Sequence, residues 1–361
     1  MPERVYNFSA GPSMLPLSAL ERAGAEITNY RGSGMSVMEM SHRSPIFQEI
    51  FDQAQDKLRR VLSIPAGYKL LFLQTGATGQ FSMVPLNLMG EAGRADYAVT
   101  GNFSQLACQE ARKYGAVHIA ASSEDRDYRY IPAQDQLELD PGASYFYYCA
   151  NNTIYGTEWN YVPETGSVPL VCDMSSNILS TPVDVSKYGL IFAGAQKNMA
   201  PAGLTVVILR EGLAGRHLPC TPLMMEYQTM IQKDSMYNTP PCWCIYMLSL
   251  TLDWVEENGG LAGMERLRRQ RSGLLYEALD SSRLFQCHAE PAARSSMNVT
   301  FRTGKPELDA QFIAQAAQAG LLNLKGHRKT GGMRASIYNA MPLEGVEKLR
   351  DFIRAFEKAN L

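Results

Sequence analysis

Short apolar runs alternate with helical patterns over most of the chain before residue 211. The runs are continuous rather than alternating in polarity, as expected for strands that are covered by helices on both faces of a parallel sheet. Strands that alternate with helices build a doubly wound, mainly parallel sheet, so the pattern predicts an α/β fold. The predicted strands are residues 68–74, 96–100, 117–121, 145–150, 168–173, 189–193 and 204–210.

The pattern changes after residue 247. Apolar positions recur at helical spacing over residues 248–280, and Gly259-Gly260 predicts a break in this segment. The elements that follow predict a smaller α+β C-terminal domain at 259–361, after a large domain at 16–258, and we expect residues 1–15 to associate with the smaller one. These elements are a strand at 297–302, a helix at 307–319, a strand at 333–338 and an amphipathic helix at 343–358.

Composition agrees with two unequal domains. The chain has 361 residues, which is too long for one ordinary core. A net charge of -2 gives no field that would favour nucleic acid or a membrane as partner. The chain start has no signal-peptide pattern, no stretch approaches the roughly 18 apolar residues of a membrane span, and seven scattered cysteines are an odd number. We therefore expect a cytoplasmic protein with reduced thiols.

Metal and hydrolase chemistry lack their motifs. The five histidines form no H-x-x-x-H or H-E-x-x-H pattern, and Cys242 and Cys244 are too closely spaced for a zinc knuckle. No Gly-x-Ser-x-Gly nucleophile elbow is present. The sequence predicts no metal site and no serine hydrolase.

Lys197 and Asp173 are the candidate catalytic residues. Each directly follows or ends a predicted strand, so both should lie at the same edge of the sheet, where such folds bind ligands. A partly desolvated lysine can form a Schiff base, and a carboxylate can pair with a protonated pyridine nitrogen. Taken alone, Lys197 is better explained as a surface lysine at a strand end, and Asp173 is equally well explained as a cap for the turn at Ser175 and Ser176.

A turn rich in small residues, 76–80, follows the first predicted strand and precedes a helical pattern that starts near Phe81. Free backbone N-H groups at a helix start suit a phosphate. The signal is weak alone, because 76–80 matches neither the P-loop nor the dinucleotide fingerprint.

Basic residues gather in three places: His42-Arg43, His327-Arg328 and Arg334. The arginine fork binds carboxylate or phosphate through two hydrogen bonds, so together they suit a doubly anionic substrate. The alternative interpretation is a set of ordinary surface arginines.

Beyond these local features, several long motifs occur in the order found in one enzyme family. Over nearly its whole length the chain resembles the phosphoserine aminotransferases, of the class-V aminotransferase family. The most specific stretches are 6–12 (YNFSAGP), 173–176 (DMSS), 194–198 (GAQKN), 238–241 (NTPP), 326–328 (GHR) and 334–342 (RASIYNAMP).

The resemblance implies a pyridoxal 5'-phosphate enzyme of fold type I, a homodimer whose active sites lie at the subunit interface. Lys197 would hold the cofactor as a Schiff base, and Asp173 would pair with its ring nitrogen. The other residues implied to contact the cofactor are Ala77, Thr78 and Gln196 at the phosphate, Asn238 and Thr239 of the partner subunit at the same phosphate, Thr153 at the ring hydroxyl, and Phe103 stacked on the ring.

The resemblance also implies the substrates, L-glutamate and 3-phosphohydroxypyruvate, interconverted with 2-oxoglutarate and O-phospho-L-serine in serine biosynthesis. Arg334 would bind the α-carboxylate, with Ser9 beside it. His42, Arg43, His327 and Arg328 match the positions that receive the distal phosphate or carboxylate. A second family reaction, which forms 4-phosphohydroxy-L-threonine for pyridoxine biosynthesis, uses an oxo acid of similar shape.

Two positions depart from the family pattern. Phe103 stands where a tryptophan commonly stacks on the ring, and phenylalanine offers less area and no N-H. Thr78 stands where close bacterial relatives have an arginine for the distal anion. Substrate affinity is therefore left open.

Other functions of the same cofactor class remain alternatives. A cysteine desulfurase needs a mobile nucleophilic cysteine, and none lies in an evident flexible loop. An alanine-glyoxylate aminotransferase has no need of two His-Arg pairs. A catalytically idle protein that stores the cofactor would share Lys197 and Asp173, but would have no use for Arg334.

Overall fold

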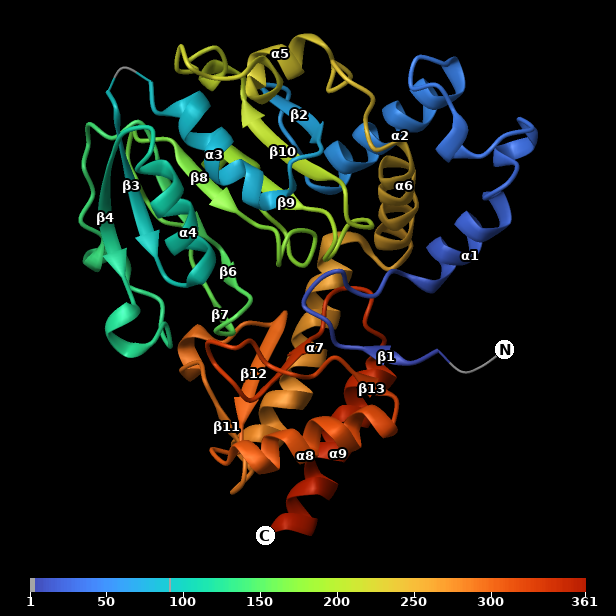
Figure 1. Ribbon diagram of the computed structural model, residues 1–361, viewed down its shortest axis with the longest axis vertical. Coiled ribbons are helices and arrows are strands. Elements are labelled where there is room, and N and C mark those ends of the chain that lie inside the picture. The colour runs from blue at the N-terminus through green and yellow to red at the C-terminus, as the bar shows by residue number, and fades with distance from the viewer. Residues whose placement is uncertain (1–3, 91) are drawn as a thin grey trace.

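The computed structural model describes residues 4–90 and 92–361, and a seven-stranded sheet forms its centre (Figure 1). The strand order is β2-β10-β9-β8-β5-β3-β4. The strands are β2 (Tyr68–Leu73), β3 (Arg94–Val99), β4 (Ala116–Ser122), β5 (Phe146–Cys149), β8 (Leu170–Asp173), β9 (Leu190–Gly194) and β10 (Thr205–Arg210).

All seven predicted strands are confirmed, with ends shifted by two residues or fewer. Pairs from β4 through β9 are parallel, whereas β10 is antiparallel to both β9 and β2. A ten-residue connection, 195–204, leads from β9 directly into β10, without the crossover helix that joins parallel neighbours. The prediction of a mainly parallel α/β sheet is therefore correct, with one reversed strand inside it.

Helices cover both faces of the sheet. Alternate residues of each strand enter opposite cores: Val206 and Ile208 pack with α2 and α6, and Val207 and Leu209 pack with α3, α4 and α5. This two-sided burial is why the strands read as continuous apolar runs. The helices are α1 (Leu17–Glu26), α2 (Pro45–Val61), α3 (Gly76–Leu88), α4 (Asn102–Ala111), α5 (Tyr227–Gln232) and α6 (Cys242–Glu257).

The predicted helix break is confirmed. Helix α6 ends at Glu257 and α7 (Gly260–Asp280) begins three residues later, with Gly259 at φ 87° and Gly260 at φ 62°. Positive φ angles cost glycine little, so this pair lets the chain change direction at low cost. The helical segment begins at Cys242, six residues earlier than the predicted residue 248, and Cys242 and Trp243 belong to its first turn.

A smaller α+β unit with its own apolar core lies below the sheet in Figure 1. The N-terminal segment joins it, since β1 pairs with β13 and Phe8 lies in its core. Its elements are β11 (Gln286–Cys287), β12 (Asn298–Arg302), α8 (Pro306–Gln318), β13 (Leu321–Leu322), β14 (Met333–Ser336) and α9 (Leu343–Asn360), with β1 at Tyr6–Asn7; the short hairpin β6 (Asn151–Asn152) and β7 (Thr157–Glu158) belongs to the upper part.

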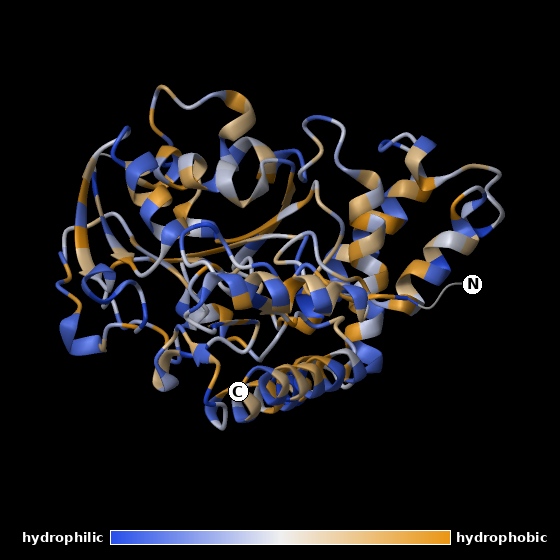
Figure 2. Cartoon of the chain, turned by 60° about the horizontal axis from the view of Figure 1, so that its bottom comes forward, coloured by the Kyte–Doolittle hydropathy of each residue, from blue (hydrophilic) through white to orange (hydrophobic). Residues whose placement is uncertain are grey.

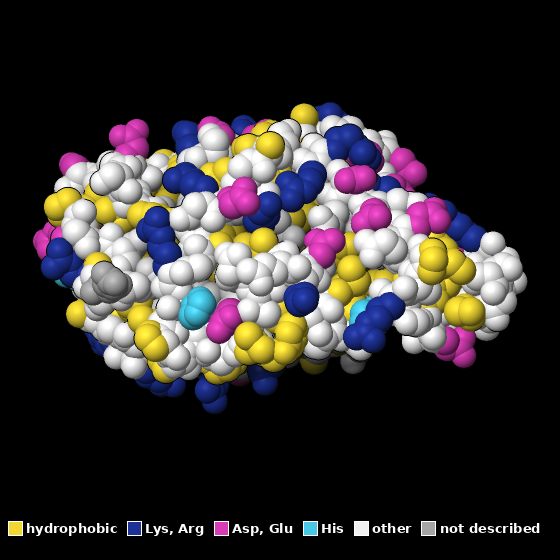
Figure 3. All heavy atoms as spheres, turned by 90° about the horizontal axis from the view of Figure 1, so that it is seen from above, with side chains coloured by type: hydrophobic (Ala, Val, Ile, Leu, Met, Phe, Trp, Pro, Cys, Tyr) yellow, Lys and Arg dark blue, Asp and Glu magenta, His cyan; other side chains and the backbone are white. Residues whose placement is uncertain are grey.

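Polar and charged side chains are distributed without strong segregation. In Figure 2 blue and orange residues alternate along the outer helices, and in Figure 3 basic and acidic side chains are interspersed on the visible face. Among residues 4–90 and 92–361, no helix is long and apolar enough to cross a membrane. The same residues contain no cluster of three His, Cys, Asp or Glu side chains that could hold a metal ion.

Candidate active site

A cavity of about 370 Å³ opens where β2, β3, β5, β8 and β9 reach their carboxyl ends. This is the sheet edge at which doubly wound folds bind ligands. The cavity brings together nine of the predicted site residues, namely Ala77, Thr78, Phe103, Thr153, Asp173, Gln196, Lys197, His327 and Arg334.

Asp173 is the last residue of β8 and is 4% exposed. Burial raises the pKa of its carboxyl group above the usual value, although the Lys197 charge and the hydrogen bonds from Ser175 oppose this shift. The Ser175 N-H donates to Oδ1 at 2.8 Å, and the Ser175 hydroxyl accepts the Gly194 N-H of the neighbouring strand at 3.0 Å. The carboxylate therefore caps the next turn, as the alternative interpretation held, and also lines the cavity.

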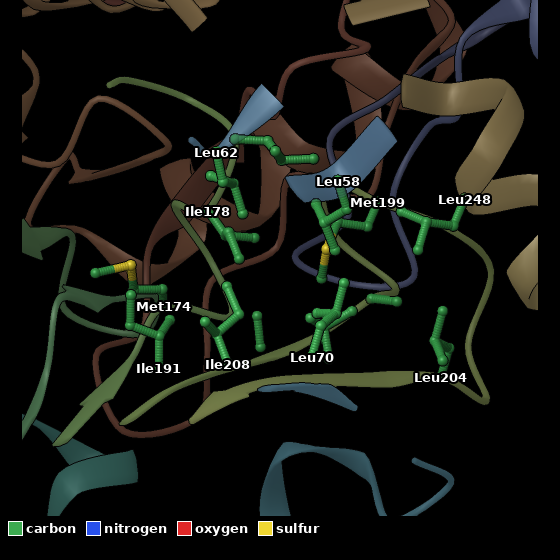
Figure 4. Close-up of a cluster of buried hydrophobic side chains, with 14 of the residues drawn as sticks. Leu58, Leu62, Leu70, Met174, Ile178, Ile191, Met199, Leu204, Ile208 and Leu248 are labelled. Carbon is green, nitrogen blue, oxygen red and sulfur yellow. The ribbon is translucent and has the colours of Figure 1, made fainter. Parts of the chain in front are cut away.

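Lys197 lies in a tight turn after β9. The turn is fixed by its main chain, where the N-H groups of Met199 and Ala200 donate to the Ala195 carbonyl at 3.1 and 2.9 Å. Met199 lies in the apolar core close to Leu58, as Figure 4 shows. Core packing thus immobilises the backbone on which the Lys197 amine is mounted.

The Lys197 amine points into the cavity toward two predicted partners. Its Nζ donates to Thr153 Oγ1 at 3.3 Å and lies 5.7 Å from the centre of the Phe103 ring. Phe103 belongs to the first turn of α4, whose start is held by the Ser104 hydroxyl as it accepts the Thr100 and Gly101 N-H groups. The amine therefore lies over the face of the aromatic ring, within the range of a cation–π contact.

The N-terminal segment closes the cavity on the side of Lys197. Ser13 donates its N-H to the Gln196 carbonyl at 3.0 Å, and its hydroxyl donates to the Lys197 carbonyl. At Gly11, φ is 138° and a Cβ would lie 3.4 Å from Lys197 Cγ, so the backbone approaches the lysine stem closely. We did not predict roles for Gly11 or Ser13, although they adjoin the small-residue motif at 6–12.

The start of helix α3 corrects one prediction. The helix begins at Gly76, not near Phe81, so residues 76–80 form its first turns rather than a turn before it. The first N-H groups of a helix have no intrahelical acceptor and lie at its positive end. Ala77 and Thr78 line the cavity there, so this positive end faces the space next to Lys197.

Arg334 brings positive charge to the opposite side of the cavity, and His327 lies on the same lining. Arg334 is on β14, its Nε is buried, and neither a hydrogen-bond partner nor a paired carboxylate is found for it within the described part of the chain. Burial lowers the pKa of the Arg334 guanidinium, and burial together with Arg334 and Arg328 lowers the pKa of His327. An anion from outside would relieve both effects.

Six predicted residues are not brought to this cavity within one chain. Arg43, Arg328, Asn238 and Thr239 are exposed, whereas Ser9 and His42 are partly buried at other places. His42 Nε2 is buried without a partner in the described residues. Sequence reasoning did not identify Asn102, Asn151 and Ser176, which also line the cavity; their polar type alone gave no signal.

The cavity residues fit pyridoxal phosphate. The buried Asp173 carboxylate suits a protonated ring nitrogen, Phe103 supplies a ring to stack on, and the start of α3 supplies N-H groups for a phosphate. Lys197 reaches the same space with its amine. The buried Cys149 also lines the cavity, but burial raises its pKa well above the usual value, so it is not activated as a nucleophile.

The chain matches a known family of enzymes. The sequence profile of the aminotransferase class-V family matches residues 5–349, most of the chain. The chain is similar to the phosphoserine aminotransferase of Bacillus cereus, with 51% identity over 358 residues and 99% of each chain covered.

Solved structures agree with the sequence matches. The fold is similar to that of phosphoserine aminotransferase from Bacillus circulans subsp. alkalophilus, with a TM-score of 0.97, 44% identity and 99% of each chain covered. It is also similar to the phosphoserine aminotransferase from Trichomonas vaginalis bound to PLP, with a TM-score of 0.94, 41% identity, and 97% of this chain and 100% of that chain covered.

Proposed function

Because the chain belongs to the aminotransferase class-V family and, within it, to the phosphoserine aminotransferases, we propose that it transfers an amino group from L-glutamate to 3-phosphohydroxypyruvate. The products are 2-oxoglutarate and O-phospho-L-serine, which places the reaction in serine biosynthesis. The enzymes of this family use pyridoxal 5'-phosphate.

The observation that carries this proposal is the position of Arg334. Its partly buried guanidinium, with Nε fully covered, lines the same cavity as Lys197 and Asp173 and is not paired with any carboxylate of the described residues. A cofactor-storing protein would gain nothing from an unpaired buried cation, whereas a substrate carboxylate would satisfy it through two hydrogen bonds. Each such charge-assisted bond contributes on the order of 1.5 to 3 kcal/mol.

The chain's own residues divide the work. The Asp173 carboxylate would hold the ring nitrogen, Phe103 would stack on the ring, and the N-H groups of Ala77 and Thr78, with Gln196, would hold the phosphate. Arg334 binds the α-carboxylate of the substrate beside Ser9, and His327 with Arg328 receives the distal anion. The N-terminal segment at Gly11 to Ser13 covers the stem of Lys197 and excludes water there.

Pyridoxal phosphate, when bound, supplies an electron-withdrawing ring and a carbonyl that takes up the amino group. Lys197 would act as the base, since its Nζ could take the proton from the substrate Cα and hold it for return. Thr153 Oγ1, 3.3 Å from that amine, orients it and would be in place for the ring hydroxyl. The two half-reactions reuse one site in turn.

A second copy of the chain would complete the site. His42, Arg43, Asn238 and Thr239 lie outside the cavity of their own chain. Exposed apolar side chains, Met35, Met38 and Ile46, flank the His42-Arg43 pair, and Tyr237 adjoins Asn238. An exposed apolar surface of this kind is typical of an interface. We therefore propose a homodimer in which each copy supplies these four residues to its partner.

Mixed dimers test the shared site. In dimers formed from Lys197→Ala and Arg43→Ala chains, half are mixed, and each mixed dimer has one site with both residues intact. Recovery to about a quarter of wild-type activity is expected from this twofold arrangement. Lys197→Ala mixed with Asp173→Asn is the control, because both residues come from one chain and no mixed site is intact. Equal activity in the two mixtures contradicts the shared site.

The substrate pair is tested by absorption of the enzyme loaded with pyridoxal phosphate. The band near roughly 400 nm should bleach with L-glutamate and return with 3-phosphohydroxypyruvate. If the band forms and neither compound changes it, the substrate assignment is wrong. Comparison with the oxo acid that leads to 4-phosphohydroxy-L-threonine decides whether the pyridoxine-pathway reaction occurs as well.

We also propose the domain division at 15/16 and 258/259. It is supported by the glycine break between α6 and α7 and by the separate core of the smaller unit, which includes Phe8 and Met14; residues 1–3 of this division lie outside the described residues. All seven cysteines are free, which supports a cytoplasmic location.

A further inference from the structure

A chain of hydrogen bonds runs from the wall of the cavity into the smaller unit and back to the N-terminal segment. It consists of Ser176, Asn151, Asn298, Tyr338 and the Ala10 carbonyl, and is called the Asn298 relay below. Asn151, Asn298 and Ser176 are between 0% and 3% exposed, so water does not replace these contacts. The relay is separate from the residues that contact the cofactor or substrate in the proposed function.

The distances are those of good hydrogen bonds. Asn151 Nδ2 donates to Ser176 Oγ at 2.7 Å and to Asn298 Oδ1 at 2.8 Å. Asn298 Nδ2 donates to Tyr338 Oη at 3.2 Å and to Ser336 Oγ at 2.9 Å. The Tyr338 hydroxyl then donates to the Ala10 carbonyl at 2.8 Å.

The direction of every bond in the relay is fixed. A carbonyl only accepts, so the Tyr338 hydroxyl must donate its hydrogen bond to the Ala10 carbonyl and accept one from Asn298 Nδ2. Asn298 therefore presents Oδ1 to Asn151, which must offer its own Nδ2. The remaining Oδ1 of Asn151 accepts from Ser295 Oγ at 2.5 Å. Both Nδ2 protons and the Oδ1 of the Asn298 side-chain amide are used, and no other side chain of this shape offers two donors and one acceptor in these places.

The relay joins three parts of the active site. Asn151 and Ser176 line the cavity in the upper part of the molecule. Asn298 and Ser336 pair across β12 and β14, and Arg334 lies two residues before Ser336 on β14, so it faces the same side of the strand. Ala10 precedes Gly11, whose backbone contacts the stem of Lys197.

We propose that Asn298 is a positioning residue that sets Arg334 and the 10–13 segment relative to Lys197. The inference deepens the proposed function and rests on it, since Arg334 matters as the carboxylate-binding group. Asn298 does not touch substrate or cofactor. Through Ser336 it holds the strand that carries Arg334, and through Tyr338 it holds the segment that covers Lys197. A single side chain thereby aligns the part of the active site in the smaller unit, Arg334, with the part in the larger unit, Lys197.

Asn298→Asp tests the relay with almost no change in shape. Aspartate cannot donate to Tyr338 or Ser336, and it places a charge against the oxygens of both. The dissociation constant of glutarate, an unreactive dicarboxylate, and the KM for L-glutamate should rise about tenfold or more, while the affinity for pyridoxal phosphate changes little. Protonation of the new carboxyl restores one donor, so activity relative to wild type should rise as pH falls.

Asn87→Asp is the matched control. Asn87 is 3% exposed, donates to the carbonyls of Met83 and Met225, and accepts from Tyr227 in the core on the other side of the sheet. It should lower thermal stability by a similar amount without a selective effect on glutarate. If Asn298→Asp and Asn87→Asp weaken glutarate binding equally, Asn298 is structural only and the proposal is wrong.

A second readout does not need catalysis. Hydrogen exchange of the Ser13 N-H, measured by mass spectrometry of an N-terminal peptide, should be faster in Asn298→Asp and in Tyr338→Phe than in wild type or Asn87→Asp. Unchanged exchange overturns the link to the 10–13 segment. If wild type fails to react with L-glutamate, the proposed function falls, while the exchange of Ser13 still decides whether the relay holds the segment.

Discussion

The two sides of the cavity are built in different ways. On the Lys197 side, each functional group is held by hydrogen bonds within one chain: Asp173 by Ser175, the turn of Lys197 by Ala195, and the amine by Thr153. On the Arg334 side, basic groups face the cavity or lie exposed, and Arg334 Nε has no partner among the described residues. We call the Lys197 side the complete side, because its catalytic groups are held within one chain, and the Arg334 side the open side, because a charge is left without a partner there. The proposed second copy would add residues to both.

On both sides of the cavity, a charged side chain that serves function is destabilised by burial. Burial raises the pKa of Asp173 and lowers the pKa of Arg334, so each charge is held at a loss that only a bound ring or carboxylate recovers. Perturbed groups of this kind are typical of functional sites. The complete side should therefore govern chemistry, and the open side should govern affinity.

The largest expected effect is on the complete side. Lys197→Ala removes the group that moves the proton and should lower kcat by at least about 1,000-fold, with glutarate binding nearly unchanged. Single-turnover kinetics with L-glutamate measure the effect. Near-normal turnover would show that another residue moves the proton. Lys187→Ala, at an exposed lysine of the same chain, is the control.

Asp173→Asn should lower kcat by roughly 100-fold, because the ring nitrogen loses its charged partner.

The Asp173→Asn change should also stabilise the cofactor-free protein at neutral pH. Since the folded-state pKa lies above 3.8, wild-type stability falls as pH rises from 3.8 through that raised pKa, and asparagine removes this loss. Denaturation of both proteins across pH measures it; parallel curves would contradict the burial argument.

Arg334→Leu tests the open side. The apolar side chain fills the space but binds no carboxylate, so kcat/KM for L-glutamate should fall roughly tenfold to a hundredfold. The thermal midpoint should hold or rise, since a buried, unpaired charge is removed. A decrease in kcat alone, with KM unchanged, would show that Arg334 acts in the chemical step and not in substrate binding.

The smallest effect is expected at Phe103→Trp. A larger ring over the cofactor adds stacking area worth about 0.5 to 1.5 kcal/mol, so the affinity for pyridoxal phosphate should rise a fewfold. Equilibrium dialysis against the cofactor measures it. A weaker affinity would mean that the gap between Lys197 and the ring, 5.7 Å in the present chain, is already filled.

Sequence patterns predicted the strands and the sheet edge because burial on both faces leaves a continuous apolar signature, as in β9. They also placed Asp173 and Lys197 together, since both follow strand ends. The start of α3 was wrong by five residues because Gly76 and Gly79 hide its first turn from propensity arguments. Asn298 could not be found this way, since its role depends on contacts between segments about 150 residues apart.

The reversed strand β10 has a consequence for how the chain is made. The edge strand β2 pairs only with β10 in the sheet order, from Leu73 to Thr205. At ribosomal rates of about 5 to 20 residues per second, the apolar stretch 70–73 waits roughly 7 to 26 seconds before its partner is synthesised. During translation the nascent strand β2 is unpaired and therefore prone to aggregate. Truncation of the chain before residue 205 would leave β2 without its partner strand.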